Sequence, residues 1–204
     1  MGELRLSVPG THNVLNALAA LGVSLDTGIP FATAREALED FTGVERRFET
    51  LGVEQDIMVI DDYAHHPTEV VATLAAARSA LGRRLTVIFQ PHLYSRTQLL
   101  MAQFARAFRE ADSVVITDIY GAREKPLPGV DARALAEAIA RNEQGKQVEY
   151  IGSKEAIVER VLETARPGDA VLTMGAGDIR EVGESLVRAL QPRANDRIEA
   201  AARR

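Results

Sequence analysis

The chain contains no cysteine among its 204 residues. This absence excludes a disulfide framework and thiolate metal ligands, and it suits a reducing compartment. No apolar run approaches the roughly 20 residues that a membrane-spanning helix needs. The first residues also lack the basic segment and apolar stretch of a secretory signal. We therefore expect a cytoplasmic protein.

Positive charge is scarce as well. The formal net charge is -5, with 24 Lys and Arg against 29 Asp and Glu, and no basic cluster is interleaved with aromatic residues. This pattern argues against an extended nucleic-acid interface, because such interfaces depend on clustered cations. We expect small-molecule ligands, with neither nucleic acid nor membrane as a partner.

Short β-rich runs alternate with segments of helical spacing between about residues 56 and 190. This alternation predicts parallel βαβ units. We therefore expect an α/β fold with a doubly wound, mostly parallel, Rossmann-like sheet and helices on both faces. The predicted strands are 57–60, 85–89, 114–117, 148–151 and 170–174. The predicted helices follow apolar stripes at 70–81, 100–107, 157–165 and 179–190.

The first 43 residues show a different pattern. They predict a helix after Pro9 and Gly10 and another at about 32–41, without room for parallel strands. Two helices rich in small residues bury too little apolar surface to be stable alone. We interpret residues 1–43 as the end of another domain and residues 44–192 as the sheet domain. Residues 193–204, where the apolar period ends, are expected to form a disordered tail.

Polar side chains cluster after four predicted strands, at the edge where doubly wound sheets bind ligands. The four loops read DDYAHHP (61–67), QPHLYSRT (90–97), DIYGAREKP (118–126) and GAGD (175–178). Each motif alone has a structural explanation, such as a helix cap or a tight turn. Their convergence on one edge would give what an active site requires. Because neighbouring side chains diverge, His65 and His66 do not suggest a shared metal ion, and we assign no metal site.

Taken together, these motifs resemble the Mur ligase family, and within it the members that add L-alanine. The matching segments, in family order, are PGTHNVLNA (9–17), GVERRFE (43–49), DDYAHHPTE (61–69), FQPH (89–92), SRT (95–97), YGAREKP (120–126) and GAGDI (175–179). The resemblance implies an ATP-dependent amide-forming ligase of peptidoglycan synthesis, with a role in cell shape and division. Such an enzyme joins L-alanine to UDP-N-acetylmuramate through an acyl phosphate, using ATP and Mg²⁺.

The resemblance also implies that part of the enzyme lies outside this sequence. Family members have three domains, which bind the UDP-sugar, ATP and the amino acid in that order. The Gly-Lys-Thr phosphate loop of the family does not occur in these 204 residues. The magnesium ligands are therefore expected mainly in the missing N-terminal and central domains, in the same or a companion chain. We expect this chain to be inactive alone.

Five residues, Arg47 among them, match the family's nucleotide-binding positions. His12, Asn13 and Asn16 resemble the adenine-recognition segment, where amides offer paired donors and acceptors to a base edge. Asn13 and Asn16 would share one helix face, although helix capping by Asn13 is a structural alternative. Asp62 resembles the aspartate that contacts the nucleotide ribose.

Arg47 resembles the arginine that meets the phosphates as the domains close. This role suits the planar and permanently charged guanidinium group. The neighbouring Arg46 is a rival for this assignment. The residues that the resemblance implies for catalysis are Arg47, Asp62, His65 and His92.

A second group matches the residues around the incoming amino acid: Tyr63, His65, His92 and Arg96. Arg96 would hold the alanine carboxylate, and one histidine could orient the amine or stabilise developing charge. The sequence leaves open which histidine has which role. Leu93 stands where relatives often have a second arginine, so that contact is absent or replaced.

Two alternatives stay open at this point. A ligase of the same family attaches a recycled murein tripeptide instead of alanine, and Tyr63 and the loop containing Glu124 favour the alanine enzyme. A non-catalytic nucleotide-binding or carboxylate-binding module would use the same loops for recognition only.

Overall fold

The computed structural model describes residues 2–191, so the predicted tail at 193–204 lies outside the described residues. The elements in chain order are α1 (Thr11–Asp26), α2 (Phe31–Glu39), β1 (Glu49–Glu54), β2 (Ile57–Asp62), α3 (Pro67–Leu81), β3 (Arg84–Phe89), α4 (Tyr94–Phe104), β4 (Ser113–Ile116), α5 (Ala132–Asn142), β5 (Gln147–Tyr150), α6 (Lys154–Thr164), β6 (Asp169–Met174) and α7 (Arg180–Leu190). Within the described residues, no helix is long and apolar enough to cross a membrane.

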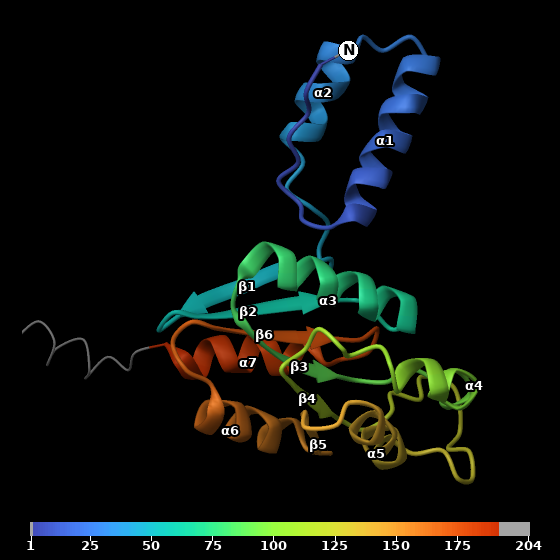
Figure 1. Ribbon diagram of the computed structural model, residues 1–204, viewed down its shortest axis with the longest axis vertical. Helices are drawn as coiled ribbons and strands as arrows, with labels where there is room; N and C mark the ends of the chain where they lie inside the picture. The colour runs from blue at the N-terminus through green and yellow to red at the C-terminus, as the bar shows by residue number, and fades with distance from the viewer. Residues whose placement is uncertain (1, 192–204) are drawn as a thin grey trace, which may run out of the picture.

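Six strands form one mixed sheet in the order β1-β2-β6-β3-β4-β5 (Figure 1). β2, β6, β3, β4 and β5 are parallel to their neighbours, and β1 pairs with β2 in the antiparallel sense. The predicted α/β fold with a mostly parallel sheet is therefore confirmed. The central strands are almost continuously buried, because helices cover both faces of the sheet.

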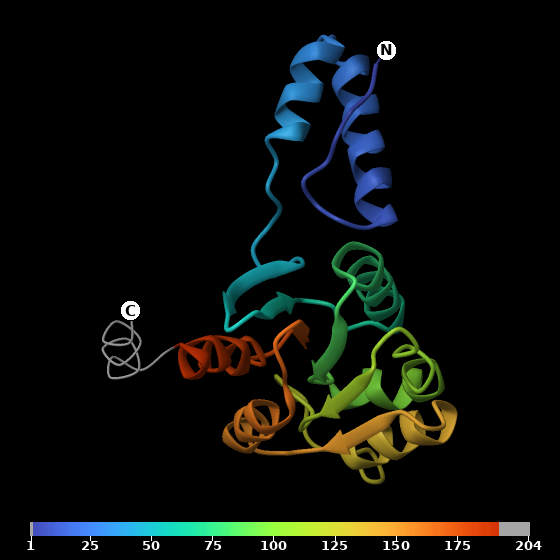
Figure 2. The same ribbon diagram turned by 60° about the vertical axis from the view of Figure 1, so that its left-hand side comes forward.

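Helices lie on both faces of the sheet (Figure 2), and the core forms one cluster on each face. α3, α4 and α5 pack on one face, where Phe89 and Phe104 are completely buried. α6 and α7 pack on the other face through Ile157 and Leu186. This two-sided burial fixes the strand ends in space, and the loops that follow them meet at one edge.

The start of α3 has capping signals that can be read in the sequence. Pro67 occupies the first turn, and the side chain of His66 accepts a hydrogen bond from the N–H of Thr68 at 3.2 Å. The carboxylate of Glu69 accepts the N–H of His66 at 3.0 Å and the N–H of His65 at 2.9 Å. These bonds satisfy helix-terminal donors and hold the loop after β2 against its helix.

Two elements, β1 and α5, were not predicted from the sequence. β1 is a partly exposed edge strand with a bulge between Thr50 and Gly52. A Cβ atom on Gly52 would lie 2.9 Å from Cγ1 of Val187. α5 buries a stripe of which two residues, Ala132 and Ala136, are alanines that give a weak hydrophobic signal. Both elements depend on contacts with distant parts of the chain.

The helices α1 and α2 lie side by side at a distance from the sheet in both views (Figures 1 and 2). Ala17 and Ala34 are the buried residues of this pair. Leu15 and Leu18 of α1 are 62% and 58% exposed. The pair thus leaves an apolar face uncovered within the described residues.

Candidate active site

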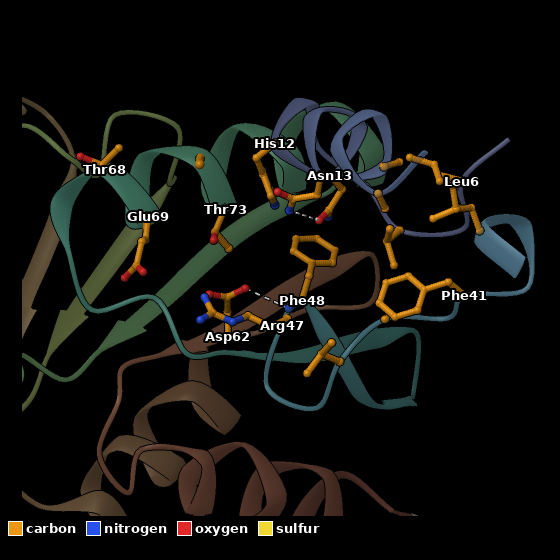
Figure 3. Close-up of a pocket in the computed structure, with 18 residues that line it drawn as sticks. Leu6, His12, Asn13, Phe41, Arg47, Phe48, Asp62, Thr68, Glu69 and Thr73 are labelled. Carbon is orange, nitrogen blue, oxygen red and sulfur yellow. Dashed lines mark hydrogen bonds between the residues drawn. The ribbon is translucent and has the colours of Figure 1, made fainter. Parts of the chain in front are cut away.

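A cavity of about 760 Å³ lies between the helix pair α1/α2 and the sheet domain (Figure 3). Its volume falls within the range of small-molecule sites. Its apolar walls include Leu6, Val8, Phe41 and Phe48. Its polar lining consists of His12, Asn13, Asn16, Arg47, Asp62, Thr68, Glu69 and Thr73. The five residues predicted for nucleotide binding therefore face one enclosure.

Asn13 and Asn16 reach this enclosure from the first turns of α1. The side-chain amide of Asn13 donates to the carbonyl of Pro9 at 2.7 Å and accepts from the amide of Asn16 at 3.4 Å. The N-cap of α1 is Gly10 and no side chain caps it, so the alternative of helix capping by Asn13 is wrong. Both residues line the cavity, and their amides keep donor and acceptor positions that these two bonds do not use.

Asp62 lies at the end of β2 and is only 5% exposed. Its carboxylate accepts the N–H of Phe48 at 2.9 Å and the N–H of Ala64 at 2.8 Å. Burial raises the pKa of Asp62 above its ordinary value, although these N–H groups and Arg47 act in the opposite direction. The bonds fix the carboxylate on the cavity floor.

The structure separates the two neighbouring arginines. The guanidinium of Arg46 donates to buried Asp61 at 3.0 Å and to the carbonyls of Gly175 and Gly177 at 2.9 Å and 3.2 Å. The side chain of Arg47 has no hydrogen bond or ion pair within residues 2–191 and lines the cavity. Arg46 is therefore committed to internal contacts, which leaves Arg47 as the arginine available to a ligand.

A second cluster joins the loops after β2 and β3. The rings of Tyr63 and His65 meet edge to face with centroids 5.4 Å apart, and the rings of His65 and His92 lie 5.9 Å apart. Nη1 of Arg96 lies 3.2 Å from Nδ1 of His92. A chain of contacts thus links the four residues predicted around the amino acid, whereas Asp62 lines the adjoining cavity.

Sequence reasoning did not assign Tyr120 or Phe48 to the site. Tyr120 stacks on His92 with ring centroids 5.6 Å apart and an interplanar angle of 17°. A Cβ atom on Gly177 would lie 2.6 Å from this tyrosine ring, so glycine is needed for the close approach. Phe48 stands between Asn13 and Asp62 in the cavity (Figure 3). Both residues lie inside the quoted motifs, but their roles depend on contacts between loops.

Tyr63 links the cavity to the histidine cluster. The guanidinium of Arg46 lies 4.8 Å from the centre of the Tyr63 ring, and the guanidinium of Arg47 lies 5.7 Å from it. These distances fall within the range of cation–π contacts. A group bound at Arg47 would therefore lie next to the residues around His65.

The loop after β6 contacts the loop after β3 at the carboxyl ends of the parallel strands. The amide of Gln90 donates to the carboxylate of Asp178 at 2.8 Å, and Gly175 adopts a φ of 151° where a Cβ atom would lie 2.8 Å from the carbonyl oxygen of Gln90. Leu93 has a φ of 71° and its N–H donates to the carbonyl of Tyr120 at 2.9 Å. One side-chain bond and one backbone bond thus tie the loops after β3, β4 and β6 together.

Within the described residues, no group of three or more His, Cys, Asp or Glu side chains is arranged to hold a metal ion. The carboxylates at the cavity, Asp62 and Glu69, are occupied by backbone N–H groups. These residues do not fit a self-contained magnesium site.

Comparison with known proteins identifies the family of this chain. The model described as "Mur ligase, glutamate ligase domain" matches residues 46–177. The chain belongs to the Mur ligase family. This assignment confirms the resemblance inferred from the motifs.

Similar Mur ligases are named for alanine addition. The chain is 51% identical over 191 residues to a UDP-N-acetylmuramate–L-alanine ligase of Geotalea uraniireducens, and these residues are 94% of this chain and 42% of that protein. A ligase of the same name from Syntrophotalea carbinolica is 50% identical over 95% of this chain and 42% of its own length. The chain therefore spans less than half the length of these relatives.

Solved Mur ligases share the fold. A UDP-N-acetylmuramate-alanine ligase of Thermotoga maritima superposes with a TM-score of 0.78 at 32% identity, over 93% of this chain and 40% of that one. A murein peptide ligase of Psychrobacter arcticus superposes with a TM-score of 0.67 at 30% identity, over 92% and 38%.

Proposed function

We propose that this chain is the C-terminal part of an ATP-dependent ligase that joins L-alanine to UDP-N-acetylmuramate through an acyl phosphate, in the cytoplasmic stage of peptidoglycan synthesis. Residues 1–43 would be the end of the ATP-binding domain and residues 44–192 the C-terminal ligase domain. The observation that carries the proposal is the position of Arg47, which lines the large cavity and also contacts Tyr63 of the histidine cluster.

The cavity suits the base and ribose of ATP. Phe48 and Phe41 offer apolar surface, while the amides of Asn13 and Asn16 offer donors and acceptors that could read a base edge. Asp62 would accept a ribose hydroxyl, and Arg47 would contact the phosphates with its free guanidinium. The exposed apolar face of α1 would pack against the rest of the ATP-binding domain.

The neighbouring cluster suits a small amino acid. Arg96 would pair with the alanine carboxylate, because a guanidinium forms charge-assisted hydrogen bonds with carboxylates. His65 and His92 would face the amine and the reacting carbonyl, at the site where the amide bond forms. Closure of the sheet domain onto the ATP-binding domain would exclude water that could hydrolyse the acyl phosphate. Mg²⁺ would be held by the upstream domains.

A chimera provides the direct test of this function. The C-terminal 42% of the Geotalea uraniireducens ligase would be replaced by this chain, which aligns with it over 191 residues. We expect the chimera to form ADP in a reaction that requires both UDP-N-acetylmuramate and L-alanine. The isolated 204-residue chain should show no turnover, because it lacks a phosphate loop.

The chimera also separates the alternatives. Preference for a murein tripeptide over L-alanine would assign the chain to the recycling ligase. A folded chimera that binds ATP but forms no product with either amine would favour a non-catalytic binding module and would reject the proposal. Turnover by the isolated chain would contradict the proposal that catalysis also needs the upstream domains.

Arg96→Ala should weaken alanine use in the chimera. Loss of a charged hydrogen-bonding partner costs about 1.5–3 kcal/mol, so we expect the KM for alanine to rise about 10–100-fold with little change in the KM for ATP. Steady-state kinetics with each substrate varied in turn would measure this. The matched control is Arg106→Ala, since Arg106 is exposed beyond the end of α4. An unchanged alanine dependence would remove Arg96 from the alanine site.

A further inference from the structure

The two ring nitrogens of His65 differ in what they can do. Nδ1 lies 2.9 Å from the carbonyl oxygen of Tyr63 and 3.4 Å from a carboxylate oxygen of Glu69. Burial alone would raise the pKa of Glu69, but its N–H partners and the charge of His65 lower it overall, so this carboxylate is ionised at neutral pH. Both oxygens can only accept, so Nδ1 must carry the proton. In the neutral ring, Nε2 of His65 is then the acceptor.

In His92 the proton lies on the other ring nitrogen. Its Nδ1 lies 3.2 Å from Nη1 of Arg96, and a guanidinium can only donate. Nδ1 must therefore accept, which places the proton of the neutral ring on Nε2. Burial, followed by the charges of Arg96 and His65, lowers the pKa of His92, and Glu124 only partly opposes this. The ring is thus neutral at neutral pH, with one N–H to donate.

Stacking fixes the planes of both rings. Tyr120 covers one face of His92, at 5.6 Å between ring centres, and Tyr63 meets His65 edge to face at 5.4 Å. The two imidazole centres lie 5.9 Å apart, close enough for both rings to reach one small ligand. The groups that fix the two protons lie only two or four residues from each ring, whereas Tyr120 comes from the loop after β4. The difference between the rings is therefore built by the way each segment folds.

We propose that the fold holds His65 and His92 in opposite tautomers, so that Nε2 of His65 accepts a proton from the incoming amine while the Nε2–H of His92 donates to the reacting carbonyl oxygen. In this step the amine nitrogen forms the C–N bond and gives its proton to His65. The C–O bond to phosphate breaks, and the phosphate leaves with the electron pair. His92 stabilises the negative charge that develops on the oxygen. These roles rest on the proposed ligase function, whereas the tautomers do not.

The tautomers can be measured in the 204-residue chain without substrate. Long-range ¹H–¹⁵N spectra of the imidazoles would be recorded at about pH 8, above the ordinary histidine pKa of about 6.5. The chain has only four histidines, and His65→Gln and His92→Gln would assign the two sets of signals. We expect Nδ1–H for His65 and Nε2–H for His92. The same tautomer in both rings, or a rapidly exchanging mixture in either, would overturn the proposal.

Arg96 variants test what holds His92. In Arg96→Ala, the pKa of His92 should rise toward its ordinary value and its Nδ1 signal should shift, because the donor and the positive charge are both lost. Arg96→Lys keeps a donor and a charge and should preserve the wild-type signals. His12 in α1 serves as the internal control, and its imidazole signals should be the same in all variants. A folded Arg96→Ala chain with unchanged His92 signals would contradict the assigned contact.

The chimera then tests the roles themselves. His65→Gln should remove a base, lower kcat by about 100-fold or more and abolish the acidic limb of the pH profile of kcat/KM. His92→Gln keeps an amide N–H near the position of Nε2, so it should retain that limb and more activity than His92→Ala. Equal loss in both glutamine variants with unaltered pH profiles would reject the roles. An inactive wild-type chimera would instead count against the ligase function and leave the tautomer result standing.

Discussion

Replacing Arg46 by alanine is expected to lower the free energy of unfolding of the chain by about 3–5 kcal/mol, the usual cost of removing one partner from a buried ion pair. Asp61 has no exposed surface, and its carboxylate is held by Arg46 at 3.0 Å and by the hydroxyl of Thr173 at 2.7 Å. Arg180 lies 3.5 Å away and compensates only in part. Urea unfolding followed by circular dichroism would measure the change.

The same substitution also releases two loops. Arg46 donates to the carbonyls of Gly175 and Gly177, and its own carbonyl accepts the N–H of Tyr63 at 2.7 Å. The matched control is Arg83→Ala, because Arg83 pairs with Asp56, which is 58% exposed, and such surface pairs contribute about 0–1 kcal/mol. If the two variants lost equal stability, the buried network would not have the structural role assigned here.

Replacing Arg47 should lower catalysis strongly and change stability little, unlike the replacement of Arg46. We expect Arg47→Ala in the chimera to lower kcat about 10²–10³-fold, as is typical when a preorganised donor to transition-state charge is removed. Stability of the isolated chain should change by only about 0.5 kcal/mol, since the side chain makes no hydrogen bond or ion pair with any other described residue. Steady-state kinetics with ATP varied and urea unfolding would supply the two measurements.

Arg47→Lys sharpens this test. Lysine keeps the charge but not the planar fork, so an intermediate kcat is expected if bidentate phosphate contact matters. Full activity of Arg47→Ala would remove the residue from the phosphate site. A loss of stability as large as that of Arg46→Ala would mean that Arg47 is a structural residue instead.

The two arginines show how far a motif can be read from the sequence. Both are cationic neighbours in one matching segment, and the sequence left them as rivals. The residue at position 46 adopts a φ of 59°, which turns the chain before β1. One guanidinium consequently points into the loop after β6 and the other into the cavity. Which of the two arginines faces a ligand depends on the path of the backbone. The residue types near these positions do not determine that path.

The histidines show the same limit. The sequence placed His65 and His92 after two strands and predicted their proximity from the rule that parallel strands end at one edge. It left their roles open, because a tautomer depends on which groups face each nitrogen. Those groups, the carbonyl of Tyr63 and the guanidinium of Arg96, are only two and four residues away, but whether they face a ring nitrogen depends on the local path of the backbone.

The sequence by itself determined the parallel βαβ core, the start of α3 and the loops that hold the polar groups. It could do so because helical and strand periodicity and capping are local properties that short segments carry. Only the tertiary structure decided that β1 joins the sheet as an antiparallel edge and that Tyr120 lies on His92 through the space left at Gly177. It also decided that Asp62 lines the cavity beside α1, whereas His65 and His92 form a separate cluster. The physical reason is that contacts between side chains far apart in the chain depend on loop paths and packing, which no local pattern records.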